Sequence, residues 1–202
     1  MNDRLKTIVD LEKYPIQDLN SPKIKEIINK CKTELDQFSC STISNFILPK
    51  SLKTMNVELE KQVDKVYMSK ESINPYLHSK DESSLEKNHP KRIFSKRYNG
   101  YLNSDLFDKN SEMKFLYEQQ ELLNFVSACV GISPIYRWAD PLACHAYNVM
   151  KPDGILPWHF DSCEFTLSIM IQKPEKGGVF EYCPYIREPG NCLLYTSDAA
   201  DE

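Results

Sequence analysis

The segment LPWHFDSCEF, residues 156–165, places a histidine and an aspartate two positions apart in an apolar run. On a β-strand, residues i and i+2 point to the same side, so His159 and Asp161 can both face the inside of a barrel while Phe160 packs on the other side. An imidazole and a carboxylate are two of the three ligands of the triad that binds ferrous iron and leaves positions open for a substrate. The pair predicts a metal site, although an inward histidine on a strand is more often a core residue.

Other residues could complete a pocket around this pair. Trp158 could form a wall of the pocket or belong to the core. Thr166 faces inward if the side that carries Phe165 and Leu167 packs outward, and this depends on a strand register that is uncertain by one residue.

Basic residues lie in the polar segment 82–108, which we expect to be a long loop that contains short extended pieces. Long loops of this kind are often lids or binding loops. Arg92, Lys96 or Arg97 could bind the carboxylate of an amino acid, because a guanidinium matches a carboxylate in a two-pronged hydrogen bond. For any single one of them, a solvated position on the loop is the simpler interpretation.

Strand patterns surround the histidine and the aspartate. Four segments are rich in β-branched or aromatic residues and are separated by Gly and Pro turns, and these are residues 143–150, 158–162, 164–172 and 179–186. Short strands in this arrangement are typical of a jelly roll or a similar double sheet.

Helices are expected in the first part of the chain. Ser21 followed by Pro22 predicts the start of a helix, and the apolar residues Ile24 and Ile28 recur at helical spacing. A second helix begins at Pro49 and a third covers residues 111–130, while residues 39–48 have the composition of a strand. The sequence therefore predicts an α+β fold, with helices packed on a jelly-roll core.

Composition limits the classes of function. The 202 residues have a net charge of −4, and the basic residues are scattered, so a nucleic-acid partner is not expected. The sequence has no apolar run long enough to span a membrane and no signal-peptide core, so we expect a cytoplasmic protein. Its seven cysteines form no C-x-x-C pair and are expected to be buried free thiols.

The segment YNVMKPDGILPWHFDSCEFTLSIMIQKPEKGGVFEY resembles the core of the iron(II)/2-oxoglutarate-dependent oxygenases. It has their order of a strand, a Pro/Gly turn, H-x-D, a strand that carries a threonine, and a Gly-Gly turn. YRWADPLACHAYNVMKPDGILPWHFD and GGVFEYCPYIR are similar to the branch that contains free-amino-acid hydroxylases and radical halogenases. The likeness extends over residues 38–191.

The resemblance implies a double-stranded β-helix, the jelly roll of this superfamily, and a chemistry. His159 and Asp161 would bind Fe(II), and 2-oxoglutarate would chelate the same ion. With O2, oxidative decarboxylation to succinate would drive hydroxylation of a C–H bond in a small, amino-acid-like substrate. The halogenases have a small residue in place of the carboxylate, so Asp161 favours hydroxylation.

The resemblance also gives Asn148 a role. Some oxygenases of the superfamily have an asparagine eleven residues before the histidine, as here, and it donates a hydrogen bond to 2-oxoglutarate. Satisfaction of Asn148 by the backbone is equally open. Many relatives have a tyrosine where this chain has Met150, which weakens this assignment.

In these oxygenases the second iron-binding histidine, and the Arg or Lys that pairs with 2-oxoglutarate, lie further along the chain. No histidine follows His159 in this sequence. Residues 192–202, CLLYTSDAADE, resemble the in-frame translation of a common transposase sequencing adapter, and a genuine acidic tail is the alternative. We therefore expect a helical extension in residues 1–37, an oxygenase domain truncated at its C-terminus in residues 38–191, and a non-native tail in residues 192–202.

The truncated chain is expected to bind iron weakly and to be inactive. Two alternatives remain open at this point: a hydroxylase of side chains on proteins or peptides, and a non-catalytic jelly-roll binding module. The sequence makes no prediction about the oligomeric state.

Overall fold

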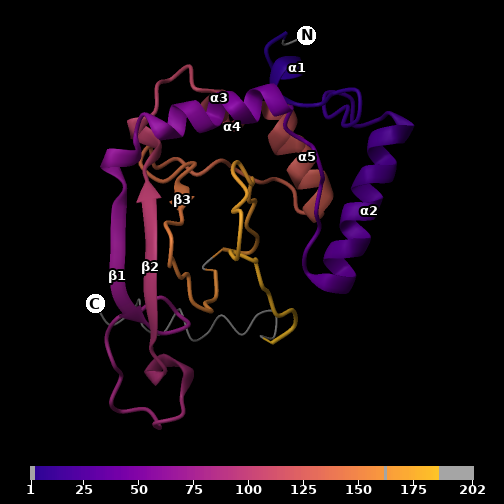
Figure 1. Cartoon of the computed structure of the whole chain (residues 1–202). Helices are drawn as coiled ribbons and strands as arrows, with labels where there is room; N and C mark the ends of the chain where they lie inside the picture. The colour runs from indigo at the N-terminus through magenta and orange to yellow at the C-terminus, as the bar shows by residue number, and fades with distance from the viewer. Residues whose placement is uncertain (1–2, 162, 187–202) are drawn as a thin grey trace.

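The computed structural model describes residues 3–161 and 163–186, which form helices around a small antiparallel sheet (Figure 1). The α-helices and strands, in chain order, are α1 (Leu5–Ile8), α2 (Pro22–Phe38), α3 (Pro49–Glu60), β1 (Tyr67–Ile73), β2 (Ser95–Leu102), α4 (Glu112–Tyr117), α5 (Gln120–Val130) and β3 (Tyr147–Val149). Short 3-10 turns lie at η1 (Val63–Lys65), η2 (Pro90–Arg92) and η3 (Ser104–Leu106).

Two helices begin where the sequence predicts. Ser21 has extended backbone before α2, and Pro22 occupies the first helical turn, where the missing N–H of proline costs nothing. Pro49 begins α3 in the same way. α2 ends at Ser39, whose backbone is left-handed and whose N–H donates to the carbonyl oxygen of Leu35.

The sheet has the order β1-β2-β3, with both pairs antiparallel. Beyond β3 the chain makes a turn over residues 151–154 and pairs with β2 again. There Ile155 and Tyr98 exchange two backbone hydrogen bonds of 2.7 and 2.8 Å. The segment that carries His159 therefore follows directly from a stretch paired with the central strand.

Buried apolar side chains from the helices and the sheet form one core. Ile24 of α2, Met55 of α3, Leu102 of β2 and Leu116 of α4 all belong to it. α2 packs against α5 on one side of the segment that follows β3, while β1 and β2 lie on its other side (Figure 1).

Most of the expected jelly-roll strands are not present in the described residues. Only residues 147–149 of the segment 143–150 are a strand, and residues 158–161, 164–172 and 179–186 have no strand. An alternating pattern makes a strand only where a neighbouring strand provides a ladder of backbone hydrogen bonds, and in the described residues these segments have no such ladder. The described chain is thus a mixture of helices and a three-stranded sheet, and a double-stranded β-helix is not confirmed.

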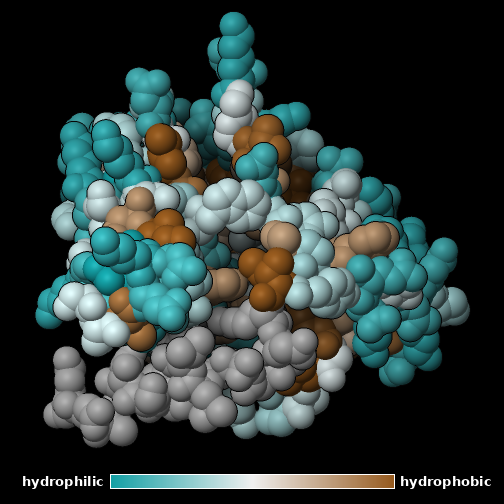
Figure 2. Space-filling view, turned by 90° about the horizontal axis from the view of Figure 1, so that it is seen from below, coloured by the Kyte–Doolittle hydropathy of each residue, from teal (hydrophilic) through white to brown (hydrophobic). Residues whose placement is uncertain are grey.

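Apolar side chains remain at the surface of these unpaired segments. Leu167 is 55% exposed and Met170 is 64% exposed. Seen from below, apolar residues are open to solvent near the middle of the molecule, and hydrophilic residues surround them (Figure 2).

Three further expectations need correction. Residues 82–108 contain the eight-residue strand β2 where only short extended pieces were expected in a loop, so Arg97 lies on the central strand rather than on a lid. Residues 39–48 form no strand, since Ser39 and Asn45 have positive φ angles that interrupt an extended chain. The helix expected over residues 111–130 is divided into α4 and α5 at Glu118 and Gln119.

Within the described residues, none of the helices combines the length and the apolar character needed to cross a bilayer.

Candidate metal centre

The side chains of His159 and Asp161 converge. Nε2 of His159 lies 3.3 Å from Oδ1 of Asp161. The imidazole is 23% exposed and the carboxylate 52% exposed, so an ion can reach both from solvent. The i and i+2 spacing thus places the two groups on one side, although the backbone here is not a β-strand.

The hydrogen bonds of His159 define which ring nitrogen can bind a metal. Nδ1 lies 2.8 Å from the carbonyl oxygen of Pro157, and a carbonyl can only accept, so Nδ1 carries the proton. In the neutral ring, Nε2 then has a free lone pair that is directed to Asp161. This is the arrangement in which a backbone carbonyl orients a metal-binding histidine.

The carboxylate of Asp161 is oriented as well. Its Oδ2 accepts a hydrogen bond of 2.7 Å from the hydroxyl of Thr166, which leaves Oδ1 on the side of His159. Two atoms with lone pairs, Nε2 and Oδ1, therefore face each other without a shared proton when the imidazole is neutral. A cation placed against both atoms, either a proton or a metal ion, removes their repulsion.

The separation of Nε2 and Oδ1 fits a metal ion. Two ligands at right angles, each about 2.1 Å from one ion, are about 3 Å apart. The observed 3.3 Å is close to this value. His159 and Asp161 can therefore hold two adjacent coordination positions without rearrangement of the backbone.

Phe160 fixes the backbone between His159 and Asp161. Its N–H donates a hydrogen bond of 2.8 Å to the carbonyl oxygen of Pro75. Its ring packs on Tyr76, with 5.2 Å between the ring centroids. The opposite orientation of Phe160 agrees with the sequence prediction that it packs away from the metal side.

Asn148 lies in a second polar group, on the sheet. Its Oδ1 accepts a hydrogen bond of 2.8 Å from Asn99 on β2, and Oδ1 of Asn99 in turn accepts one of 2.8 Å from Nε of Arg97. Nη1 of Arg97 lies 3.7 Å from a carboxylate oxygen of Glu71 on β1. The four side chains form a row across one face of the three strands.

Sequence reasoning missed the central member of this row. Asn99 is completely buried, and its amide connects Arg97 to Asn148. The available signal was the alternation of Arg97, Asn99 and Tyr101, which places all three on one face if the segment is a strand. The partner of Asn148 is thus a side chain rather than the backbone.

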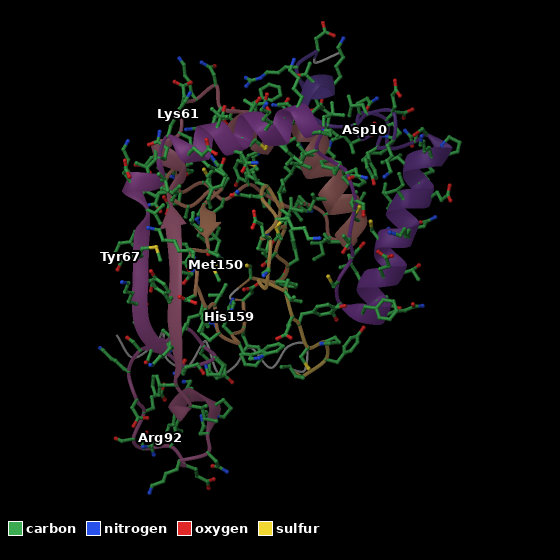
Figure 3. All side chains as sticks on the ribbon, in the orientation of Figure 1. Asp10, Lys61, Tyr67, Arg92, Met150 and His159 are labelled. Carbon is green, nitrogen blue, oxygen red and sulfur yellow. The ribbon has the colours of Figure 1, made fainter. Side chains whose placement is uncertain are left out.

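Of the other predicted site residues, Thr166 and Trp158 lie beside the His159–Asp161 pair, and Arg92 does not. Thr166 contacts Asp161, as described above, and Trp158 is 59% exposed beside the histidine. Arg92 lies in the lobe that projects beyond β1 and β2, away from His159 (Figure 3). There its guanidinium donates two hydrogen bonds, of 2.9 and 3.0 Å, to Asp81.

A third metal ligand is not found among residues 3–161 and 163–186, where no group of three or more His, Cys, Asp or Glu side chains is placed to hold an ion. Among the described residues, His159 and Asp161 are therefore a pair of potential ligands without a third beside them.

No protein-family model matches the chain, and no curated protein matches it.

Proposed function

We propose that this chain contains part of the active site of an Fe(II)- and 2-oxoglutarate-dependent dioxygenase that hydroxylates a small, amino-acid-like substrate. The observation that carries the proposal is the convergence of Nε2 of His159 and Oδ1 of Asp161 at 3.3 Å. Ferrous iron prefers this mixture of imidazole and carboxylate ligands. When bound, iron with 2-oxoglutarate and O2 supplies the oxidising chemistry.

The residues of this chain would bind and orient. His159 and Asp161 hold two neighbouring positions on the ion, and the remaining positions stay open for 2-oxoglutarate and O2. Thr166 keeps the carboxylate turned toward the histidine through its hydrogen bond to Oδ2. Pro157 keeps the imidazole in the tautomer that can bind.

The polar row on the sheet would contribute to substrate or cosubstrate binding. Arg97 supplies positive charge, and its side chain is only 15% exposed, so its electrostatic interactions are weakly screened by solvent. Asn148 uses its carbonyl oxygen on Asn99, so its NH2 group can donate to a carboxylate.

The double-stranded β-helix is part of the same proposal. β3 and the pairing of Ile155 with Tyr98 lead antiparallel along β2 toward the iron ligands, which is the order that the proposed fold requires.

Metal binding by the 202-residue chain tests the proposal. We expect anaerobic titration with Fe(II), or with Co(II) as a spectroscopic substitute, to show one weak site, because the described residues provide only two protein ligands. His159→Ala and Asp161→Ala are each expected to lower the affinity by at least about tenfold. His78→Ala, which removes an exposed histidine in the projecting lobe, is the matched control and should bind as the original chain does.

The coordinated ligands can be identified directly. Electronic absorption of bound Co(II) is expected to show nitrogen and oxygen ligands and to disappear in the His159→Ala variant. Equal metal binding by the His159→Ala and His78→Ala variants would contradict the proposal. Succinate release by the 202-residue chain is expected to stay at background, since two ligands do not hold the ion firmly.

A further inference from the structure

Two buried cysteines lie where α2 packs against α5. Cys31 continues the apolar stripe of Ile24 and Ile28 on α2, and Cys129 continues that of Phe125 on α5. Cys31 is 2% exposed and Cys129 is 8% exposed. Both stripes turn inward to the same helix–helix contact, and a side-chain hydrogen bond there connects the two thiols.

The two thiols have unequal acidity. Hydrogen bonding by the Cys129 thiol, together with smaller contributions from Ser41 and the positive charge of Lys30, lowers the pKa of Cys31 to about 6 despite burial. The same contact with Cys31, with burial, raises the pKa of Cys129. The contact therefore makes Cys31 the more acidic thiol of the pair, with Cys129 as the hydrogen-bond donor. This order of acidity suits a nucleophile at Cys31 and a resolving cysteine at Cys129.

A surface cleft leads to Cys31. Its volume is about 580 Å³, and Cys31 is among the residues that line it. Three lysines also line the cleft, and these are Lys13, Lys23 and Lys30. A small, uncharged oxidant can enter such a cleft and meet a sulfur that is otherwise covered.

We propose that Cys31 and Cys129 form a peroxide-reactive dithiol that closes to a disulfide between α2 and α5. The Cys31 thiolate attacks one oxygen of hydrogen peroxide, so that an S–O bond forms, the O–O bond breaks, and hydroxide leaves and takes up a proton to become water. The Cys129 thiol loses its proton and attacks the sulfenic sulfur, and the S–O bond breaks with release of a second water. In total, two thiols are oxidised to one disulfide and one peroxide is reduced to two waters.

Packing alone would place two small apolar side chains between the helices, but it requires no cleft that reaches one of the two sulfurs. Cys163 is exposed, unlike Cys31 and Cys129, and serves as a comparison for the buried pair. In the part of the chain that the structure describes, its sulfur contacts the hydroxyl of Thr166 at 3.7 Å and no second thiol. Accessibility alone would favour oxidation of Cys163, whereas the proposal favours the buried pair.

Peroxide treatment of the native 202-residue chain tests this inference. A metal chelator is included, so that the outcome does not depend on iron at His159 and Asp161. After remaining thiols are alkylated, peptide mapping by mass spectrometry without reduction is expected to show Cys31 linked to Cys129 within one chain. In urea the preference should disappear, because the pairing depends on the fold.

Two variants separate the nucleophile from the resolving cysteine. In Cys129→Ser, which keeps a hydroxyl donor, Cys31 is expected to react but to stop at the sulfenic acid, which dimedone traps. In Cys31→Ser, oxidation of Cys129 is expected to be slower by about tenfold or more, because burial disfavours its thiolate and the cleft is lined by residue 31 rather than by Cys129. Cys163→Ser is the control and should form the disulfide at the original rate.

Either of two results would overturn the inference. One is a Cys31 thiol that stays reduced in the native chain while Cys163 is oxidised. The other is a Cys31–Cys129 link that forms no faster in the native chain than in urea.

Discussion

The orientation of His159 and Asp161 depends on two hydrogen bonds, one to each side chain. The carbonyl of Pro157 holds the imidazole and the hydroxyl of Thr166 holds the carboxylate. Both partners lie within five residues of the atoms that they orient. The convergence is therefore a local property of residues 157–166, and it does not require a complete barrel.

Removal of the Thr166 hydroxyl should loosen this site. Thr166→Val keeps the shape of the side chain but deletes the hydrogen bond to Oδ2 of Asp161, so the carboxylate can rotate away from His159. We expect the affinity for Co(II) to fall by about tenfold, as for other partners that orient metal ligands. Titration of the variant beside Ser168→Ala, a nearby exposed hydroxyl, measures the effect. Equal affinities in the two variants would show that the hydrogen bond has no role.

His145 makes stability depend on pH. Burial, with a smaller contribution from the charge of Lys114, lowers the pKa of His145 from 6.5 to about 4. Between these two values the unfolded chain binds the proton more readily than the folded chain, so the free energy of unfolding falls as the pH falls through this window. Since the ring is partly exposed, we expect a loss of about 2 kcal/mol rather than the full value of the shift.

Urea unfolding at several pH values between 4 and 7 measures this dependence. The His145→Phe variant lacks the titrating ring, so the difference in stability between the original chain and the variant should change across the window. His78→Phe is the control for a histidine in the exposed lobe. A constant difference between the original chain and His145→Phe would contradict the assigned shift.

Contacts between residues close in sequence could be predicted from the sequence, whereas contacts between residues distant in sequence could not. The contact of Thr166 with Asp161 follows from a separation of five positions. The link between Asn148 and Arg97 passes through Asn99 and depends on β2 pairing with β3 across 49 positions. Local periodicity contains no information on which strand lies beside which.

At the scale of elements, β2 is the strand on which the site depends. It pairs with β1 on one edge and with β3 and Ile155 on the other. Gly100 lies in its second half, where a Cβ atom would overlap Cγ1 of Val66 and lie 2.9 Å from Sδ of Met68. This position therefore needs glycine because of a close approach by neighbouring side chains.

Gly100→Ala is expected to destabilise the fold by about 1–3 kcal/mol, the usual range for an overpacked position. Urea unfolding at neutral pH measures the change. The double variant Gly100→Ala with Val66→Ala removes the nearest obstacle and should recover part of the lost stability relative to Val66→Ala alone. A Gly100→Ala chain as stable as the original would contradict the close approach.

The success of the predictions differed between helices and strands for a physical reason. Ser21, Pro22 and Pro49 define helix starts through their own backbone preferences, and α2 and α3 begin there. β1 was not predicted, and β2 was expected only as short extended pieces in a loop, because their segments are polar on one face and are stabilised by each other. Ser69, opposite Asn99, is buried by that pairing and not by its own character.

At the scale of the whole molecule, the described chain has a part with helices and paired strands, residues 5–130, and a part with neither, residues 163–186. Residues 5–130 contain all of the helices and the two long strands, and their apolar side chains share one core. Residues 163–186 have strand-like sequences but pair with no strand within the described chain. Their contacts with the remainder include Ile171, whose carbonyl oxygen accepts a hydrogen bond of 3.3 Å from Asn56 on α3.

This division predicts the pattern of hydrogen exchange. Among the described residues, no backbone N–H of residues 163–186 donates a hydrogen bond, whereas those of β2 are paired with β1 or β3. An amide exchanges quickly when no hydrogen bond must open first. We expect residues 163–186 to exchange fully at the shortest labelling time, and β2 and α5 to remain protected. The measurement is mass spectrometry of peptic peptides at neutral pH, with the urea-unfolded chain as the reference for full exchange. Slow exchange in residues 164–172 would contradict the extended, unpaired structure and would restore the strand that the alternation of this segment predicts.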